Sequence, residues 1–266
     1  MLDSSENEKI TEFKQVSNLT ALLVDGNNVY LATKNPYIDN SGITHSAIWQ
    51  LKLEQTENGY ILSPAQTSTD DPEAINPVPY YQTSSDIFEG EIDDSTFRIT
   101  DLYSSEDGSI YGLLANYIEK VNWDSVSDED KNKSFMRGSV FKLEQNTSRQ
   151  NNSSDPIMNA THLGLRKSFP LTLENLATAK QDFILPRKIV GVMNKKLVIV
   201  DDGMVPDSND CNVDRFVLFD LAGEISETID VGRSFTTQAS VSSNKFFISL
   251  SPGNLDLYKL YYNVRD

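Results

Sequence analysis

The sequence is poor in the residues that most often carry redox, metal or nucleophilic chemistry. Its 266 residues include one cysteine, Cys211, and two histidines, His45 and His162. A single cysteine excludes an intrachain disulfide, which fits a reducing compartment and equally a bacterial envelope protein that needs none. A zinc site of protein ligands would have to use both histidines, and nothing in their spacing indicates one. Both histidines are therefore predicted to lie at the surface.

Positive charge is also scarce, with 23 lysines and arginines against 39 aspartates and glutamates. The net charge of −16 repels phosphate backbones and anionic lipid, so nucleic-acid partners and membrane-surface binding are disfavoured. No run approaches the roughly 18 consecutive apolar residues of a transmembrane helix, so no membrane span is expected. The N-terminal residues MLDSSENEK lack the basic and apolar regions of a signal peptide.

Residues 1–9 are expected to form a polar tether, followed by a single domain over residues 10–266. A polar tether often follows a cleaved bacterial lipoprotein signal. The hypothesis for localisation is therefore a bacterial periplasm or cell envelope, with the cytoplasm as the alternative. The chain is long enough for one large domain with a sizeable core, in which patterned apolar segments alternate with long polar loops.

A tetrapeptide made of an aliphatic, an aromatic, a polar and a leucine residue occurs four times. Two short β-like runs precede each copy, and a tight polar turn joins the two runs. The tetrapeptides are residues 48–51, 140–143, 218–221 and 257–260, and the turns are residues 25–28, 106–109, 193–196 and 242–245. The turns are rich in glycine, asparagine and aspartate, which accept the positive φ angles of tight hairpins. Since no segment shows a sustained helical period, the predicted fold class is all-β.

A fourth strand is predicted after each of the first three tetrapeptides, at residues 59–65, 162–171 and 224–231. Four-stranded units in series predict a β-propeller with about four visible blades and long loop insertions. The shortest tetrapeptide spacing, 257 − 218 = 39 residues, is close to the roughly 40–45 residues of a blade. A strand at residues 10–16 would close the last blade. The alternatives are a β-sandwich, where alternation and turns look similar, and part of a larger propeller.

The hairpins VDGNNVYLA and EDGSIYGLLA resemble those of NHL-type and related bacterial β-propeller repeats, whose second strand commonly follows Asp-Gly. The resemblance covers the four units and leaves out the insertions. It implies a fold with a central channel and rims built from loops. Function does not follow from such a fold.

One polar insertion carries a cluster of oxygen ligands of the kind that calcium prefers. The candidate calcium ligands are Asp207, Asp210, Asn212 and Asp214. The last three alternate as at the start of an EF-hand loop, but Arg215 stands where that loop needs glycine. A solvated acidic loop is the competing interpretation, and no other cofactor is expected.

The sequence contains no nucleophile elbow, phosphate loop or dinucleotide fingerprint, and no catalytic residue is assigned. These observations favour a non-enzymatic, monomeric binding protein that presents its loops to a protein or carbohydrate partner. The alternative is a metal-assisted hydrolase or lactonase with carboxylates at the channel mouth, for which Asp25, Asp107, Asp201 and Asp202 are the candidates.

Overall fold

The structure is a computed structural model. It describes residues 19–38, 44–65, 78–83, 97–116, 138–149, 155–163, 186–193, 195–204, 212–230, 236–242, 245–250 and 258–263. Every regular element in these ranges is a β-strand, so the all-β prediction is confirmed. A search of the same ranges for helices long and apolar enough to cross a membrane finds none.

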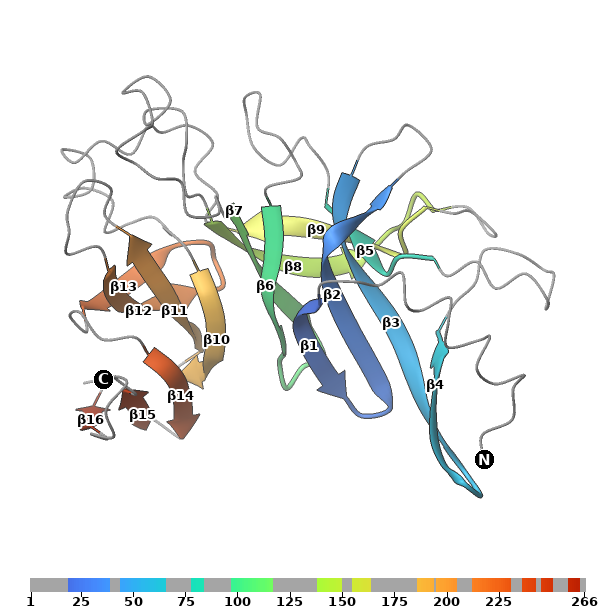
Figure 1. The fold of residues 1–266 in the computed structure, drawn as a ribbon. Helices are drawn as coiled ribbons and strands as arrows, with labels where there is room; N and C mark the ends of the chain where they lie inside the picture. Colours follow the sequence, from blue (N-terminus) through green and yellow to red (C-terminus); the bar gives the residue numbers. More distant parts are fainter. Residues whose placement is uncertain are drawn as a thin grey trace, which may run out of the picture.

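Sixteen strands in the described ranges form four antiparallel sheets, and each sheet follows chain order (Figure 1). The first contains β1 (Leu19–Asp25), β2 (Asn28–Ile38), β3 (Thr44–Thr56) and β4 (Gly59–Pro64), with the short β5 (Tyr81–Gln82) also paired to β3. The second contains β6 (Phe97–Ser104), β7 (Ile110–Asn116), β8 (Gly138–Gln145) and β9 (Met158–Leu163). The third contains β10 (Pro186–Met193), β11 (Lys196–Met204), β12 (Asn212–Asp220) and β13 (Ile225–Asp230). The fourth contains β14 (Thr236–Ser242), β15 (Lys245–Leu250) and β16 (Tyr258–Asn263).

The four predicted hairpins all form, as β1–β2, β6–β7, β10–β11 and β14–β15. In the first, Gly26 takes φ 57° between the paired strand ends, the left-handed conformation that glycine adopts without strain. In the second, the Asp107 carboxylate accepts hydrogen bonds from the Ser105 hydroxyl and from the Ser109 N–H, the latter at 2.9 Å. Local side-chain chemistry therefore sets the turns, as the sequence predicts.

The predicted fourth strands are found in the first and third sheets, as β4 and β13. In the second sheet the fourth strand is β9, which spans Met158–Leu163 and so begins four residues before the predicted range of 162–171, whose residues 164–171 lie outside the described structure. Met158 and Ala160 are partly buried against the core while Asn159 and Thr161 are exposed, and these polar residues concealed the alternation. The predicted tether and the strand at residues 10–16 lie outside the described residues.

The second sheet is packed on both faces because successive residues on a strand point to opposite sides. Leu114 and Phe141 join a buried cluster with residues of the first sheet, while Leu113 and Val140 join a cluster with residues of the third. Gly112 is paired with Phe141, and a Cβ atom at this glycine would overlap the Phe141 ring. The first strands β1, β6, β10 and β14 lie beside one another in chain order (Figure 1).

Candidate functional site

Polar side chains join the first strands of neighbouring sheets. The Ser104 hydroxyl of β6 donates a hydrogen bond of 3.0 Å to Oδ2 of Asp25, at the end of β1. The Thr100 hydroxyl of β6 donates one of 2.7 Å to the carbonyl oxygen of Pro186, at the start of β10. The sheets form separate ladders, so these contacts help to hold the first strands together.

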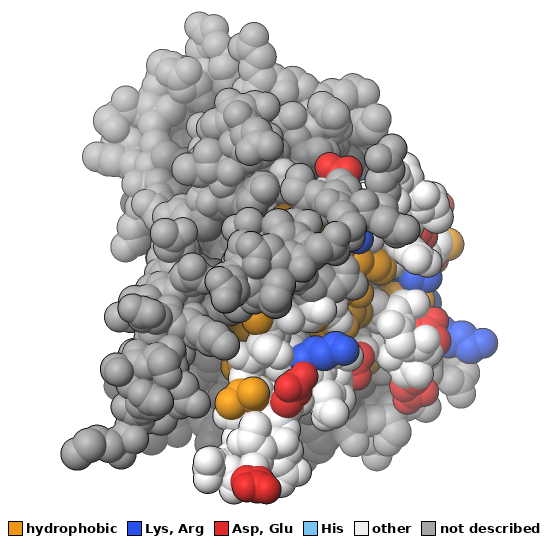
Figure 2. Space-filling model, turned by 90° about the vertical axis from the view of Figure 1, so that its right-hand side faces the viewer, with side chains coloured by type: hydrophobic (Ala, Val, Ile, Leu, Met, Phe, Trp, Pro, Cys, Tyr) orange, Lys and Arg blue, Asp and Glu red, His pale blue; other side chains and the backbone are white. Residues whose placement is uncertain are grey.

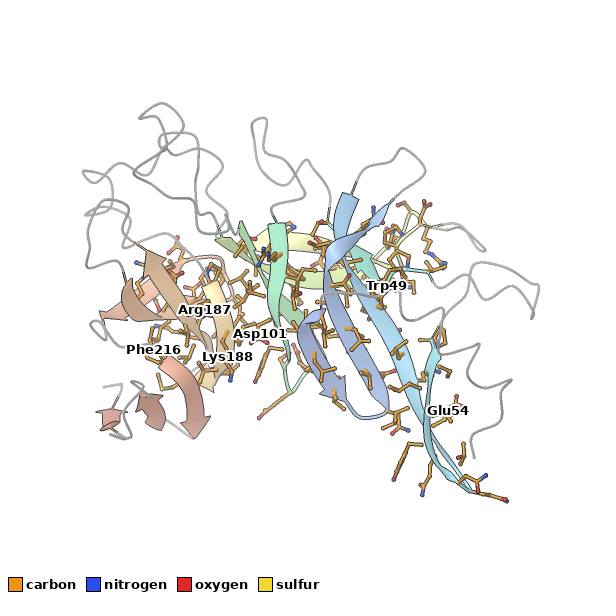
Figure 3. The ribbon with its side chains drawn as sticks, viewed as in Figure 1. Trp49, Glu54, Asp101, Arg187, Lys188 and Phe216 are labelled. Atoms are coloured by element: carbon orange, nitrogen blue, oxygen red, sulfur yellow. The ribbon has the colours of Figure 1, made fainter. Side chains whose placement is uncertain are left out.

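Asp101 makes a third contact of this kind. It lies where the register between β6 and β7 shifts, and its Oδ2 accepts a hydrogen bond of 2.7 Å from the Ile189 N–H of β10. Burial raises the pKa of the Asp101 carboxyl, although N–H groups of Ile189 and Leu102 and the charge of Lys188 lower it in part. Figure 3 shows Asp101 between β6 and β10. Its carboxylate is engaged with backbone N–H groups, which is the role of a link between sheets.

A histidine network lies between the first and second sheets. Nδ1 of His162 on β9 is 3.1 Å from the Ser139 hydroxyl, and its Nε2 is 3.4 Å from the Tyr81 hydroxyl. The His162 ring also packs against Phe141, with 5.8 Å between ring centroids. Burial lowers the pKa of His162 to about 4, so the ring is neutral at pH 7. The surface position predicted for His162 is therefore wrong, and the side chain of His45 lies outside the described residues.

A serine beside a histidine is the arrangement of a nucleophile and its base. Here Ser139 is fully buried and Tyr81 is 4% exposed, so a substrate carbonyl would have to displace core residues to reach the serine hydroxyl. The network instead joins β5, β8 and β9 through hydrogen bonds. Its chemistry is structural.

A buried ion pair occupies one of the carboxylates that the sequence offered for catalysis. Asp201 of β11 lies directly opposite Arg215 of β12. Nε and Nη2 of Arg215 donate hydrogen bonds of 3.0 and 2.7 Å to Oδ2 of Asp201, and both side chains are buried. This geometry neutralises the carboxylate inside the third sheet.

The predicted calcium ligands fall partly outside the described structure. Asp207 and Asp210 lie in the segment that is not described, while Asn212 and Asp214 belong to β12, opposite Met204 and Asp202. Across the described ranges no three His, Cys, Asp or Glu residues are grouped so that they could hold a metal ion. The calcium site stays a prediction.

Exposed large apolar side chains gather on the first sheet. Of the eight such residues in the described structure, six lie on β1 or β4. They are Leu19, Leu22 and Val24 on β1, and Tyr60, Ile61 and Leu62 on β4, each at least half exposed. The other two, Val192 and Leu221, lie apart from them in the third sheet. Figure 2 views the molecule from the β4 side, where orange hydrophobic side chains reach the surface among acidic and basic ones.

The strand β4 is the outermost strand of its sheet. It pairs with β3 from Gly59 to Pro64, and no other described strand pairs with it. Its sequence, GYILSP, contains no charged residue. Within the described part of the chain, its outer edge therefore presents backbone N–H and C=O groups beside apolar side chains.

The fold and this surface define an all-β protein of successive antiparallel meanders with one apolar sheet edge. No family model matches the sequence, and no curated protein matches it.

Proposed function

We propose that the chain is a non-enzymatic binding protein, that its scaffold is a β-propeller, and that its first sheet carries the binding surface. The observation that carries this proposal is the concentration of exposed apolar side chains on β1 and β4. Large apolar side chains that gather at the surface of a protein mark an interaction site more often than scattered single ones do. β1 and β4 are the two outer strands of the β1-β2-β3-β4 order, so the exposed apolar side chains lie along both edges of the first sheet.

The order of the sheets supports the propeller scaffold. A β-sandwich needs two sheets that face each other, whereas the second sheet here packs between the first and the third. The first strands of all four sheets lie beside one another in chain order, as the inner strands of propeller blades do.

The reactive groups support binding rather than catalysis. The Ser139–His162 pair is closed to a substrate, the Asp101 carboxylate is used by backbone N–H groups, and Asp201 is neutralised by Arg215. Valine, leucine and isoleucine side chains complement the apolar core of a protein interface, so the proposed partner is a protein. A bacterial periplasmic or envelope location remains part of the proposal.

Site-specific photo-crosslinking tests the proposal in cells that make the protein. A benzophenone amino acid replaces Leu22 or Leu62 on the first sheet, and Leu221 serves as an exposed leucine away from it. The expected result is a discrete adduct with another protein from position 22, position 62 or both, and none from position 221. Equal adducts from all three positions, or none from the first sheet, would contradict the proposal.

A further inference from the structure

We infer that β4 is a site of strand addition, at which an extended, apolar segment with basic flanks, supplied by a partner protein, pairs with its outer edge. The inference rests on the proposed binding function and specifies how the first sheet recognises its partner. In strand addition, main-chain hydrogen bonds give affinity, and alternate side chains give specificity. Three properties of β4 support this inference: its regular pairing, the lack of features that would block an added strand, and the charge around it.

The strand β4 is a regular template. It pairs with β3 through six consecutive residue pairs, from Leu51↔Pro64 to Thr56↔Gly59, with no shift in register. Six residues of strand are about 20 Å long, which is enough to pair with a short extended segment. Tyr60 and Leu62 point to one face of the sheet and Ile61 to the other, so an added strand would find apolar neighbours on both faces.

Proteins usually protect an outer strand with charge, proline or a bulge. The outermost strand of the third sheet, β13, carries Glu227 and Asp230, and its pairing with β12 shifts in register. The last strand of the fourth sheet, β16, carries Lys259. In β4 the only such feature is Pro64, at its very end. Among the residues that the structure describes, the run from Gly59 to Ser63 thus has none of these protecting features.

Charge around β4 points to the chemistry of the partner. Two exposed acidic residues lie on the same hairpin, Glu54 directly opposite Ile61 and Glu57 in the turn, against one lysine, Lys52. A basic residue beside Ile61 on an added strand would share a sheet face with Glu54, about 10 Å away across β4, and the net charge of −16 would attract a basic segment. The occupant is therefore an apolar segment with basic flanks.

A second copy of this chain fits the edge less well. Each copy carries a net charge of −16, so two copies repel each other. Self-association through β4 is the competing outcome in the experiment below.

The probe is a synthetic peptide of about ten residues, in which valine and threonine alternate between lysine flanks. A second peptide carries methyl groups on alternate backbone nitrogens, which removes donors but keeps the side chains, and a third has glutamate flanks. Fluorescence anisotropy measures the binding of each to the full chain. The lysine-flanked peptide is expected to bind, and the methylated and glutamate-flanked peptides to bind at least about tenfold more weakly.

A pair of chain variants localises the binding. Ile61→Lys places on β4 the kind of charge that protects other edges, and it is expected to weaken peptide binding about tenfold or more. Leu221→Lys makes the same change at an exposed leucine in a turn and is expected to leave binding unchanged. Equal melting temperatures of both variants and the unmodified chain verify that the fold is kept.

Equal binding of the methylated and unmethylated peptides would overturn strand addition, and so would binding that Ile61→Lys leaves unchanged. A dimer in sedimentation that Ile61→Lys dissociates would also overturn it, because the occupant would then be a second copy. If the peptides fail while crosslinks from the first sheet persist, strand addition is wrong and the binding function stands. If both experiments fail, both proposals are wrong.

Discussion

The first and second sheets share the same strand order but differ in what covers them. In the second sheet, Leu113, Leu114, Val140 and Phe141 are all fully buried, because other sheets pack on both faces. In the first, β1 and β4 leave six large apolar side chains at least half exposed. Similar meanders thus differ in cover: the first sheet adds residues to the core but leaves its outer strands exposed. This exposure is the basis of the proposal that the first sheet serves in recognition.

The largest expected loss of stability comes from a change in the third sheet. Arg215→Leu removes the guanidinium that binds Asp201 and leaves that carboxylate buried, so the free energy of unfolding should fall by about 3–5 kcal/mol. Urea unfolding of the variant measures the loss. The double variant Arg215→Leu with Asp201→Leu should recover much of it, because no buried charge remains. A single variant as stable as the unmodified chain would show that the ion pair does not support the core.

The second-largest effect is a loss of stability in acid, caused by His162 at the junction of the first two sheets. The pKa of His162 is about 4 in the folded chain and 6.5 in the unfolded one, so the unfolded state binds more protons between these values. Stability is therefore full above pH 6.5 and falls as the pH drops toward 4, by roughly 3 kcal/mol. Denaturant unfolding across this range checks it. His162→Gln should flatten the slope relative to the unmodified chain, and equal slopes would refute the assignment.

A smaller loss is expected from Gly112→Ala in the second sheet. The added methyl group meets the Phe141 ring, and overpacking of this kind costs about 1–3 kcal/mol. Thermal or urea unfolding measures the change. An unchanged stability would mean that the Phe141 ring moves aside, and that the packing between the first two sheets is looser than its burial indicates.

The smallest effect on stability is expected on β4. Leu62→Thr changes an exposed edge residue to one that also favours strands, so the free energy of unfolding should change by less than about 0.5 kcal/mol. The same urea titration measures it. A loss comparable to that of Gly112→Ala would place Leu62 in the core and remove the contrast between the two sheets.

Local chemistry made much of the fold predictable. Asp-Gly and Asn-rich turns located the hairpins, and the tetrapeptides at residues 48–51 and 140–143 lie in β3 and β8, with Ile48 and Phe141 in one buried cluster. The error at β9 has a physical reason, since its polar alternate residues hide a half-buried strand.

The sites were less predictable because their partners are distant in the sequence. Tyr81 and His162 are 81 residues apart, and Asp101 and Ile189 are 88 apart, so no local pattern marks either contact. The β4 strand was predicted from the sequence, but its exposure depends on what the other sheets cover. The signal that marks it is the uncharged run GYILSP in a strongly acidic chain.

Amide hydrogen exchange tests the contrast between the sheets most directly, with and without the lysine-flanked peptide. Without peptide, amides of residues 59–63 should exchange faster than those of residues 110–116, whose strand lies between two others. With peptide, protection should rise at residues 59–63 and stay unchanged at residues 110–116. Slow exchange in β4 without peptide, or protection gained elsewhere, would contradict the account of the first sheet as the surface of recognition.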